Sequence, residues 1–373
     1  MPYGDAMNEV ATANEGVQEP TAAAIEHIAT VMNNGWLCML LAVGERLGLH
    51  VALAEAGETT ASEIAERAGC DTRYLEEWLW GMVASGLVTA SDASEPTFTL
   101  RTEYVPALTP SGGPLHWSRI TTQITALASL EDPLVDAFRT GDGLAADHYE
   151  GRVAEVLAGE SGPIFERALL TEVLPLTGRV EQLEAGIRVA DLGCGTGSAL
   201  LILAKRFPNS TFIGVDQSRS ALGTAEARRD AQGLTNVTFE WGELEGEFEI
   251  GEQDLVIAAN TVHDLSSPQR FFERVRSILS PGGLLYLHEL SATTDMRVNA
   301  KDPHALGILA FSLYHCLPLA KRRHGIAPGG MWGRERYVAA LSDAGFEDIT
   351  THRAPSDPNN DTILARVPQR AGH

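Results

Sequence analysis

From residue 187 onward, short apolar runs alternate with stretches of helical spacing. Residues 187–192 form an apolar run of strand length, residues 199–207 place apolar side chains at helical intervals, and residues 211–215 form a second run. The alternation continues with strands at 237–241, 254–260, 284–289, 346–352 and 362–367, and with helices at 217–232, 267–279 and 336–344. Unbroken apolar runs are typical of strands buried on both faces, and strand–helix alternation favours parallel strands. The sequence therefore predicts an α/β fold with a doubly wound, mostly parallel, seven-stranded Rossmann-like sheet.

The first part of the chain has a different pattern. Helical apolar spacing covers 21–32 and 36–47, and two further helices follow at 59–66 and 72–85. Short apolar runs at 88–90 and 98–100 then flank a polar loop, as in a β-hairpin. Helix, turn, helix and hairpin in this order predict a winged helix-turn-helix. We expect four parts: a disordered tail at 1–20, a mostly helical winged-helix domain at 21–104, an all-helical connector at 105–180, and the α/β domain at 181–373.

A glycine-rich turn separates the first strand of the sheet from the helix that follows it. Gly193, Gly195 and Gly197 let the backbone approach a ligand closely, and the helix N-terminus directs N–H groups toward it. The second strand ends on Asp216, whose carboxylate can accept hydrogen bonds from both hydroxyls of a ribose. A dinucleotide-binding turn has a third glycine at the position of Ser198, so this turn indicates another nucleotide-like ligand.

Charge limits the partners of the protein. The 373 residues include 28 basic and 50 acidic side chains, for a formal net charge of −22. Such a surface repels nucleic acid and anionic membranes. Acidic residues also outnumber basic ones across the two central helices of the winged helix, so this domain is expected to mediate packing or dimerisation instead of DNA binding.

The first residues, the apolar stretch 36–54 and the cysteine spacing bear on localisation and metal binding. The first ten residues lack a basic and then apolar signal-peptide pattern, and the apolar stretch 36–54 is interrupted by charged residues and His50. Four scattered cysteines have no C-x-x-C spacing. We therefore expect a cytoplasmic protein with no membrane partner and no bound metal.

The run Asp-Leu-Gly-Cys-Gly-Thr-Gly at 191–197 resembles the first motif of class I S-adenosylmethionine-dependent methyltransferases. That resemblance implies S-adenosylmethionine as the cofactor, with S-adenosylhomocysteine as its product. It implies cofactor contacts from the carboxyl ends of the strands, with the methionine part against Asp191, Gly193, Cys194, Gly195 and Gly197, the ribose on Asp216, the adenine beside Gln217 and Glu243 or the N–H of Leu244, and the ammonium on the carbonyl of Asn260.

An acidic winged helix ahead of such a domain is similar to the dimerisation domain of small-molecule O-methyltransferases and of a related bacterial group. The resemblance implies a homodimer through the N-terminal helices. In the plant-type enzymes a His-Asp pair after the fourth strand supplies the general base, which matches His263, and two acids that orient it match Glu289 and Glu335. The implied reaction is O-methylation of a small molecule by a catalytic domain at 181–373, with the connector at 105–180 as wall and lid of the substrate pocket. The residues do not decide whether O, N, C or S receives the methyl group.

The acceptor pocket is expected around residues 306–332, where this chain differs from the plant-type pattern. Its candidate residues are Phe311, Tyr314, His315 and Trp332, with Cys316 beside them, and His315 is an alternative base. Two other functions stay open at this point. One is a cyclase or isomerase built on the same fold, and the other is a ligand-sensing regulator that uses its winged helix on DNA.

Overall fold

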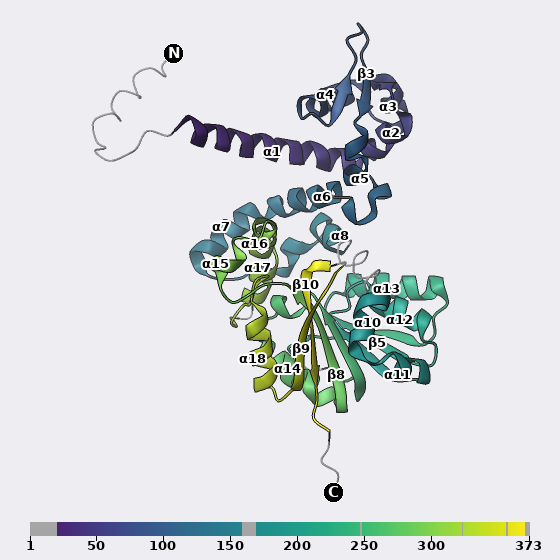
Figure 1. Cartoon of the computed structure of the whole chain (residues 1–373), viewed down its shortest axis with the longest axis vertical. Coiled ribbons are helices and arrows are strands. Elements are labelled where there is room, and N and C mark those ends of the chain that lie inside the picture. The colour runs from purple at the N-terminus through teal and green to yellow at the C-terminus, as the bar shows by residue number, and fades with distance from the viewer. Residues whose placement is uncertain (1–20, 159–168, 247, 323, 356, 370–373) are drawn as a thin grey trace, which may run out of the picture. The chain divides into compact units, whose positions relative to one another are not determined.

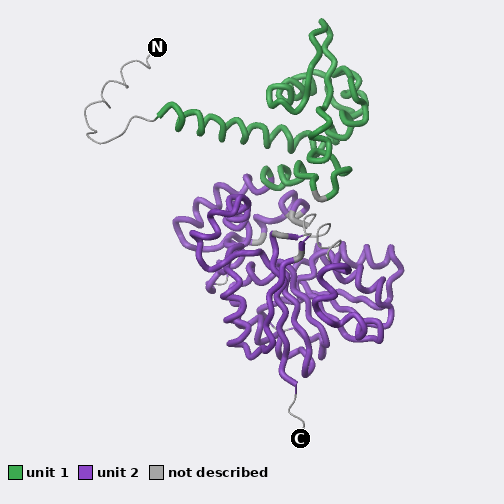
Figure 2. The backbone as a smooth tube through the Cα atoms, in the orientation of Figure 1, with its two compact units in different colours: residues 1–125 green, residues 126–373 purple. Residues whose placement is uncertain are grey.

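The structure, a computed structural model, describes residues 21–158, 169–246, 248–322, 324–355 and 357–369. The predicted tail at 1–20 and residues 159–168 of the predicted connector lie outside the described residues. The chain divides into two compact units, 1–125 and 126–373, which Figure 2 colours green and purple. The stretch 105–180, predicted as one connector, is therefore shared between the two units.

Unit 1 contains the predicted winged helix. Its elements are α1 Ala22–Arg46, α2 Leu49–Ala56, β1 Thr59–Thr60, α3 Ala61–Ala68, α4 Thr72–Ala84, β2 Val88–Ala90, β3 Thr97–Leu100, α5 Val105–Leu108 and the start of α6 Ser118–Leu127. The strands pair antiparallel in the order β1-β3-β2. Thr60 and Glu63 cap α3 reciprocally, and Asp71 caps α4, as their side chains favour.

Helix α1 is one continuous helix of 25 residues, where the sequence predicts two shorter ones (Figure 1). Gly35 in its middle does not break it, because one glycine costs only about 1 kcal/mol in a helix interior. By length and composition alone, α1 could cross a membrane. A single helix of this kind is weak evidence for a span, since core helices and signal sequences meet the same criterion.

A buried polar cluster joins the end of α1 to the rest of unit 1. The carboxylate of Glu45 lies 3.0 Å from His116 Nε2, accepts a 2.6 Å hydrogen bond from Ser118 and lies 3.7 Å from His50 Nδ1. Burial raises the pKa of Glu45, but hydrogen bonds from His50, Ser118 and His116 together lower it to about 2. A carboxylate with a depressed pKa stabilises the folded state above its unfolded pKa of about 4.3, and this contribution is lost as the pH falls toward 2.

We expect Glu45→Ala to lower the free energy of unfolding of unit 1 by about 2 kcal/mol at pH 7, because His116 and Ser118 lose their common hydrogen-bond acceptor. Hydrogen exchange of the amides of α2 and α4 measures this loss, and the difference from wild type should shrink below pH 4. Glu55→Ala, at an exposed position on α2, is the matched control. Equal exchange in both variants would show that the cluster contributes nothing to stability.

Unit 2 contains the predicted seven-stranded sheet. Its helices are α7 Glu131–Thr140, α8 Arg152–Ala158, α10 Leu174–Thr177, α11 Val180–Ala185, α12 Ser198–Arg206, α13 Arg219–Gln232, α14 Pro268–Ile278, α15 Met296–Asn299, α16 Ala305–Tyr314, α17 Cys316–Lys321 and α18 Arg334–Asp343. Its strands are β4 Arg188–Leu192, β5 Thr211–Asp216, β6 Val237–Trp241, β7 Gln253–Ala259, β8 Leu279–Leu290, β9 Glu347–Ala354 and β10 Asp357–Arg366.

The strand order is β6-β5-β4-β7-β8-β10-β9. The first five strands in this order pair in parallel, and β10 pairs antiparallel with both β8 and β9. Because the chain moves outward from β4 to β6 and then returns to β7 beside β4, a crevice forms at the carboxyl ends of β4 and β7. Ligands of doubly wound sheets bind at such a reversal.

The apolar strand runs are explained by cores on both faces of the sheet. Val189 of β4 and Ile257 of β7 pack into one core with α11 and α12, whereas their neighbours Ala190 and Val256 pack into the other core with α14 and α18. Figure 1 shows these helix pairs on opposite sides of the strands. Alternate side chains of one strand point to opposite faces, so a strand covered on both faces needs apolar residues at every position.

Candidate functional site

The glycine turn after β4 adopts a backbone that only glycine forms readily. Gly193, Gly195 and Gly197 have φ values of 86°, 52° and 76°. A Cβ at Gly193 would lie 2.4 Å from the Thr261 hydroxyl oxygen, whereas a Cβ at Gly195 would meet no described atom within 4 Å. The turn is thus packed tightly at its start and faces open space in its middle, where a ligand can approach the backbone.

Two carboxyl groups lie beside this turn, of which Asp191 is buried and Asp216 is half-buried. Asp216, at the end of β5, accepts 2.8 Å hydrogen bonds from the N–H groups of Gly195 and Ser218. Asp191 is 3% exposed, and its Oδ1 has no hydrogen-bond partner among the described residues. Burial, with a smaller contribution from the negative charge of Asp216, raises the pKa of Asp191 to about 7. A cation placed between this pair and the turn would stabilise both carboxylates.

The remaining predicted cofactor residues lie at the ends of the neighbouring strands. Gln217 and Glu243 are exposed, and Asn260 is exposed with φ of 49°, a conformation that asparagine tolerates. Leu244 packs its side chain into the core, so only its main chain can serve a ligand. Cys194 is also buried, and burial raises the pKa of its thiol, so it acts as a small apolar residue.

Trp241 is a residue at this edge that the sequence analysis missed. It ends β6, its indole N–H donates to the carbonyl of Gln217 at 3.0 Å, and the Arg219 guanidinium lies 4.7 Å from the ring centroid. The side chain is nevertheless 45% exposed. An aromatic side chain at the tip of a strand that follows the ribose-type acid is the signal that could have indicated it.

His263 lies in a 3-10 turn, Val262–Asp264, directly after β7 and is buried. Its Nδ1 lies 2.5 Å from Oε2 of Glu289, which is 0% exposed. Because an ionised carboxylate only accepts hydrogen bonds, Nδ1 carries the hydrogen and Nε2 is left for other partners. The other oxygen of Glu289 accepts from the N–H groups of Thr261 and Val262 at 3.1 and 2.7 Å. The predicted pair of His263 and Glu289 is thus present, and hydrogen bonds from the backbone hold the Glu289 carboxylate.

The second ring nitrogen of His263 faces another acid. Nε2 lies 3.4 Å from Oδ1 of Asp264. Burial alone would lower the pKa of His263, but the negative charges of Asp264 and Glu289 raise it well above its ordinary value. The imidazole therefore has a strong affinity for a proton, as a general base requires.

The prediction that Glu335 orients His263 is wrong in its geometry. Glu335 is exposed, and its carboxylate accepts a 2.9 Å hydrogen bond from the N–H of Thr294. Tyr337 takes that place, because its hydroxyl donates to Oε2 of Glu289 at 3.1 Å. Residues two apart point to different faces of a helix, so only one of them can face the sheet. The i, i+4 pair of Tyr337 and Leu341, both buried, is the signal for the inward face of α18.

Aromatic side chains surround His315, which precedes Cys316 in the chain. His315 lies 5.2 Å from Phe311 and 5.4 Å from Tyr149 between ring centroids, and the Tyr149 hydroxyl donates to the carbonyl of Tyr314 at 2.8 Å. Burial lowers the pKa of His315, which keeps it neutral. These contacts bring together three of the four predicted acceptor residues and add Tyr149, which the sequence analysis did not identify.

Cys316 completes this side of the site. Its sulfur, the Asp264 carboxylate and the His263 ring offer atoms that all lie within 4.8 Å of one another. The sequence predicts no metal, because its cysteines have no C-x-x-C spacing and no acid cluster lies near a His or Asn at ligand spacing. The structure brings Cys316 close to His263 and Asp264, at a spacing that could hold a metal ion. Burial raises the pKa of the Cys316 thiol to about 12, so the residue is a neutral thiol there.

Comparison with known proteins identifies the two units. Residues 183–312 match the family model of a methyltransferase domain, and residues 35–110 match an Rv2258c-like winged HTH domain. The chain carries an S-adenosylmethionine-dependent methyltransferase domain behind a winged helix. The predicted fold and family are thereby confirmed.

Curated relatives match parts of the chain. Trans-aconitate 2-methyltransferase from Deinococcus radiodurans is 40% identical over 26% of this chain and 36% of its own length, and the Acidovorax ebreus enzyme of the same name is 29% identical over 42% and 66%. Methyltransferase calH from Penicillium decumbens is 30% identical over 59% and 62%. The chain thus spans between about a third and two thirds of the length of these relatives.

Solved structures of methyltransferases share the fold over nearly the whole chain. An O-methyltransferase family protein from Burkholderia thailandensis superposes with a TM-score of 0.69 at 16% identity, covering 93% of this chain and 99% of the other. Human N-acetylserotonin methyltransferase, in complex with S-adenosylmethionine, has a TM-score of 0.63 at 20% identity, covering 95% and 100%. At such identities the likeness shows the fold.

The residues of the methyltransferase domain fit S-adenosylmethionine, its cofactor. Gly195 faces open space, and the unpartnered oxygen of Asp191 lies in a site that also carries the half-buried carboxyl group of Asp216. A sulfonium and an ammonium are cations that would offset these charges.

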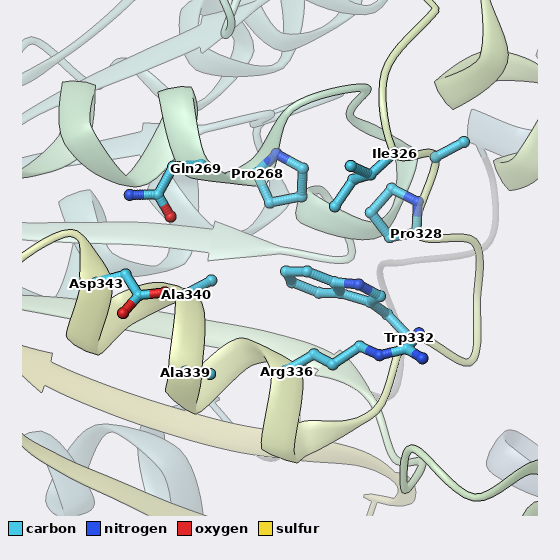
Figure 3. Close-up of a pocket in the computed structure, with 10 residues that line it drawn as sticks. Pro268, Gln269, Ile326, Pro328, Trp332, Arg336, Ala339, Ala340 and Asp343 are labelled. Atoms are coloured by element: carbon cyan, nitrogen blue, oxygen red, sulfur yellow. The ribbon is translucent and has the colours of Figure 1, made fainter.

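Trp332, also predicted to line the acceptor pocket of this methyltransferase domain, lies in a different hollow. Its ring is buried, meets Tyr337 edge-on at 4.6 Å between centroids, and lines a groove of about 460 Å³ between α14 and α18. Figure 3 shows the indole between Pro268 and Pro328 on one side and Arg336 on the other. None of the residues around His315 lines this groove, so Trp332 supports α18 and the Tyr337 contact instead of the acceptor.

Proposed function

We propose that the protein is an S-adenosylmethionine-dependent methyltransferase that methylates a hydroxyl group of a small molecule, with His263 as general base. The observation that carries the proposal is the buried pair of His263 and Glu289, in which Glu289 occupies Nδ1 and leaves Nε2, 3.4 Å from Asp264, as the ring nitrogen that can take a proton. The pair follows β7, the strand next to the glycine turn of β4. Base and cofactor turn therefore share one edge of the sheet.

The cofactor roles follow from this edge. Asp216 would accept the ribose hydroxyls, the backbone from Gly193 to Gly197 with Asp191 would hold the methionine part, and the adenine would lie between Gln217 and the Glu243–Leu244 main chain. The carbonyl of Asn260 would accept from the ammonium. When bound, the cofactor supplies an electrophilic methyl group on a positively charged sulfur.

Residues of the protein would activate and position the acceptor. A neutral hydroxyl is a poor nucleophile, since even a phenol has a pKa of about 10. His263 would take its proton on Nε2 as the oxygen bonds to the methyl carbon, and Glu289 would stabilise the imidazolium that forms. Phe311, His315 and Tyr149 would hold the acceptor and exclude water.

The local charge favours a neutral acceptor over a polycarboxylate. Asp264 and Glu289 flank His263, whereas His315 and Tyr149 are uncharged, because burial lowers the pKa of the first and raises that of the second. A trianion such as trans-aconitate would be repelled by these carboxylates. The acceptor is therefore expected to differ from that of the trans-aconitate methyltransferases.

A binding and turnover assay tests the proposal. Purified protein is titrated with S-adenosylmethionine by calorimetry and then incubated with a panel of phenols, alcohols and trans-aconitate, and products are weighed by mass spectrometry. We expect micromolar cofactor binding and a product heavier by one CH₂ from a hydroxyl acceptor. A product of unchanged composition would identify a cyclase or isomerase, and methylation of trans-aconitate alone would refute the neutral acceptor.

The pH dependence of turnover provides a separate prediction. Protonated His263 cannot accept a proton, and its pKa is raised, so kcat/KM should increase with pH through an apparent pKa above 6.5. Glu289→Gln removes one of the two charges that raise this pKa and should move the rising limb to lower pH. A flat profile between pH 6 and 9 would contradict the role of His263.

We also propose that α1 pairs with a second copy of the chain. Ile25, Ile28, Met32, Trp36 and Met39 repeat at three- and four-residue intervals, and each is more than half exposed. Such a stripe on a long helix is typical of a helix–helix interface. A cytoplasmic location remains part of this proposal.

Trp36→Asp should convert a dimer to a monomer in light scattering at micromolar concentration, because it places a charge at the centre of the stripe. Asn34→Asp adds the same charge two residues away on another face of α1 and serves as the control. A monomeric wild type, or wild-type protein that sediments with lipid vesicles, would contradict pairing with a second copy.

A further inference from the structure

Arg228 of α13 forms hydrogen bonds with the second half of the glycine turn. Its Nη1 lies 3.1 Å from the carbonyl oxygen of Thr196, 3.2 Å from the hydroxyl of Thr196 and 2.9 Å from the hydroxyl of Ser198. Arg228 is partly buried. One guanidinium nitrogen therefore contacts both residues that flank Gly197.

The same face of α13 packs directly against the turn. Ala225 precedes Arg228 by three residues, and a Cβ added at Gly197 would lie 3.1 Å from the Ala225 Cβ. Residues three apart are neighbours on a helix surface. The contact of Arg228 is thus part of a packed interface and not an isolated surface pair.

The two halves of the turn are held by different groups. The N–H groups of Gly193 and Cys194 donate to the carbonyl of Val215, and that of Gly195 donates to Asp216. The second half leads into α12 through Gly197, which is the N-cap residue and has no side chain to cap this end of the helix. Arg228 supplies the side-chain contacts of this second half, next to the position where Gly195 faces open space.

We propose that Arg228 is a positioning residue that fixes residues 196–198 in the conformation that binds the cofactor, and thereby sets cofactor affinity without changing the rate of methyl transfer. The inference rests on the proposed cofactor site. Fixing a turn before the ligand arrives improves affinity, because the entropy of ordering is already lost in the free protein.

This role explains Ser198. The position carries glycine in a dinucleotide-binding turn, whereas here its hydroxyl is the closest of the three acceptors of Arg228 Nη1. A hydrogen bond from a charged donor is stronger than one between neutral groups. The Ser198 hydroxyl therefore gives Arg228 a contact that a glycine at this position could not provide.

Calorimetry with S-adenosylhomocysteine tests the proposal on five full-length proteins: wild type, Arg228→Ala, Arg228→Lys, Ser198→Ala and the control Arg229→Ala. Arg229 is on the same helix and pairs with the neighbouring Asp230. We expect about tenfold weaker binding for Arg228→Ala and about threefold for Ser198→Ala, with Arg228→Lys in between and the control within twofold of wild type. The effects of Arg228→Ala and Ser198→Ala should be less than additive, since they remove one shared contact.

Hydrogen exchange of the ligand-free proteins supplies a readout that a general loss of stability would not reproduce. In Arg228→Ala the amides of residues 195–198 should exchange faster, while those of β4 and β7 stay as in wild type. Unchanged exchange at the turn, or faster exchange across the whole sheet, would overturn the proposal, as would equal affinity in Arg228→Ala and wild type. If wild type itself fails to bind, the cofactor proposal is lost, and the exchange measurement still decides whether Arg228 orders the turn.

Discussion

The His263→Ala variant is expected to lose about 10²- to 10⁴-fold in kcat, whereas its affinity for S-adenosylhomocysteine stays within twofold of wild type. The imidazole is the group that would take the proton on Nε2, and Glu289 and Asp264 together favour the protonated state that the reaction produces. Removing it leaves the hydroxyl without an acceptor for its proton. Steady-state kinetics with a hydroxyl acceptor found in the panel and calorimetry measure the two quantities separately.

His315→Gln is the matched comparison. His315 also lies in the enclosure, but burial lowers its pKa and it packs between Phe311 and Tyr149, so we expect a change in KM with kcat within about fivefold of wild type. Full turnover by His263→Ala together with an inactive His315→Gln would transfer the role of base to His315. Loss of cofactor binding in His263→Ala would mean that the residue maintains structure instead.

Asp216→Ala should weaken S-adenosylhomocysteine binding by at least about 100-fold. Its carboxylate accepts from the N–H groups of Gly195 and Ser218 and so joins the glycine turn to the start of α13. The same oxygens retain lone pairs for the ribose hydroxyls. The substitution removes the ligand contact and leaves the N–H groups of Gly195 and Ser218 without their acceptor.

Asp216→Asn separates these two effects, because one amide oxygen can still accept while the NH₂ group cannot. We expect an intermediate affinity for this variant. Asp230→Ala, at an exposed position of the adjacent helix, is the control and should bind as wild type does. An affinity within threefold of wild type in Asp216→Ala would exclude the carboxylate from the cofactor site.

Local sequence patterns were enough to predict most residues of the proposed cofactor site. The glycines of the turn and Asp216 are close in sequence, and the strands that flank them reveal themselves as apolar runs because both faces of the sheet are covered. Their positive φ values and the bond from Gly195 to Asp216 agree with that expectation. Such a site is predictable, because one strand-turn-helix-strand unit contains it.

The residues of the proposed acceptor site were harder to predict from the sequence. Glu335 and Tyr337 are two residues apart, and the sequence motif favoured the acid, whereas the packing of α18 turned the tyrosine toward Glu289. Trp332 was grouped with the aromatic residues of α16 but packs beside α14. Tyr149 and His315 meet although they are far apart in the chain. No local sequence pattern predicts these contacts between residues that are distant in the chain.

The sequence by itself determined the α/β class, the winged helix and the glycine turn followed by Asp216, because periodicity, capping residues and short motifs act over neighbouring residues. The pair of His263 and Glu289 was expected only from the family resemblance, since His263 follows β7 whereas Glu289 lies on β8. Only the tertiary structure decided that α1 is one helix, that Tyr337 replaces Glu335, that Cys316 adjoins the base and that Arg228 holds the turn. These features depend on which face of each helix packs against the sheet. Helix phase and packing are set by the whole core and not by any single segment.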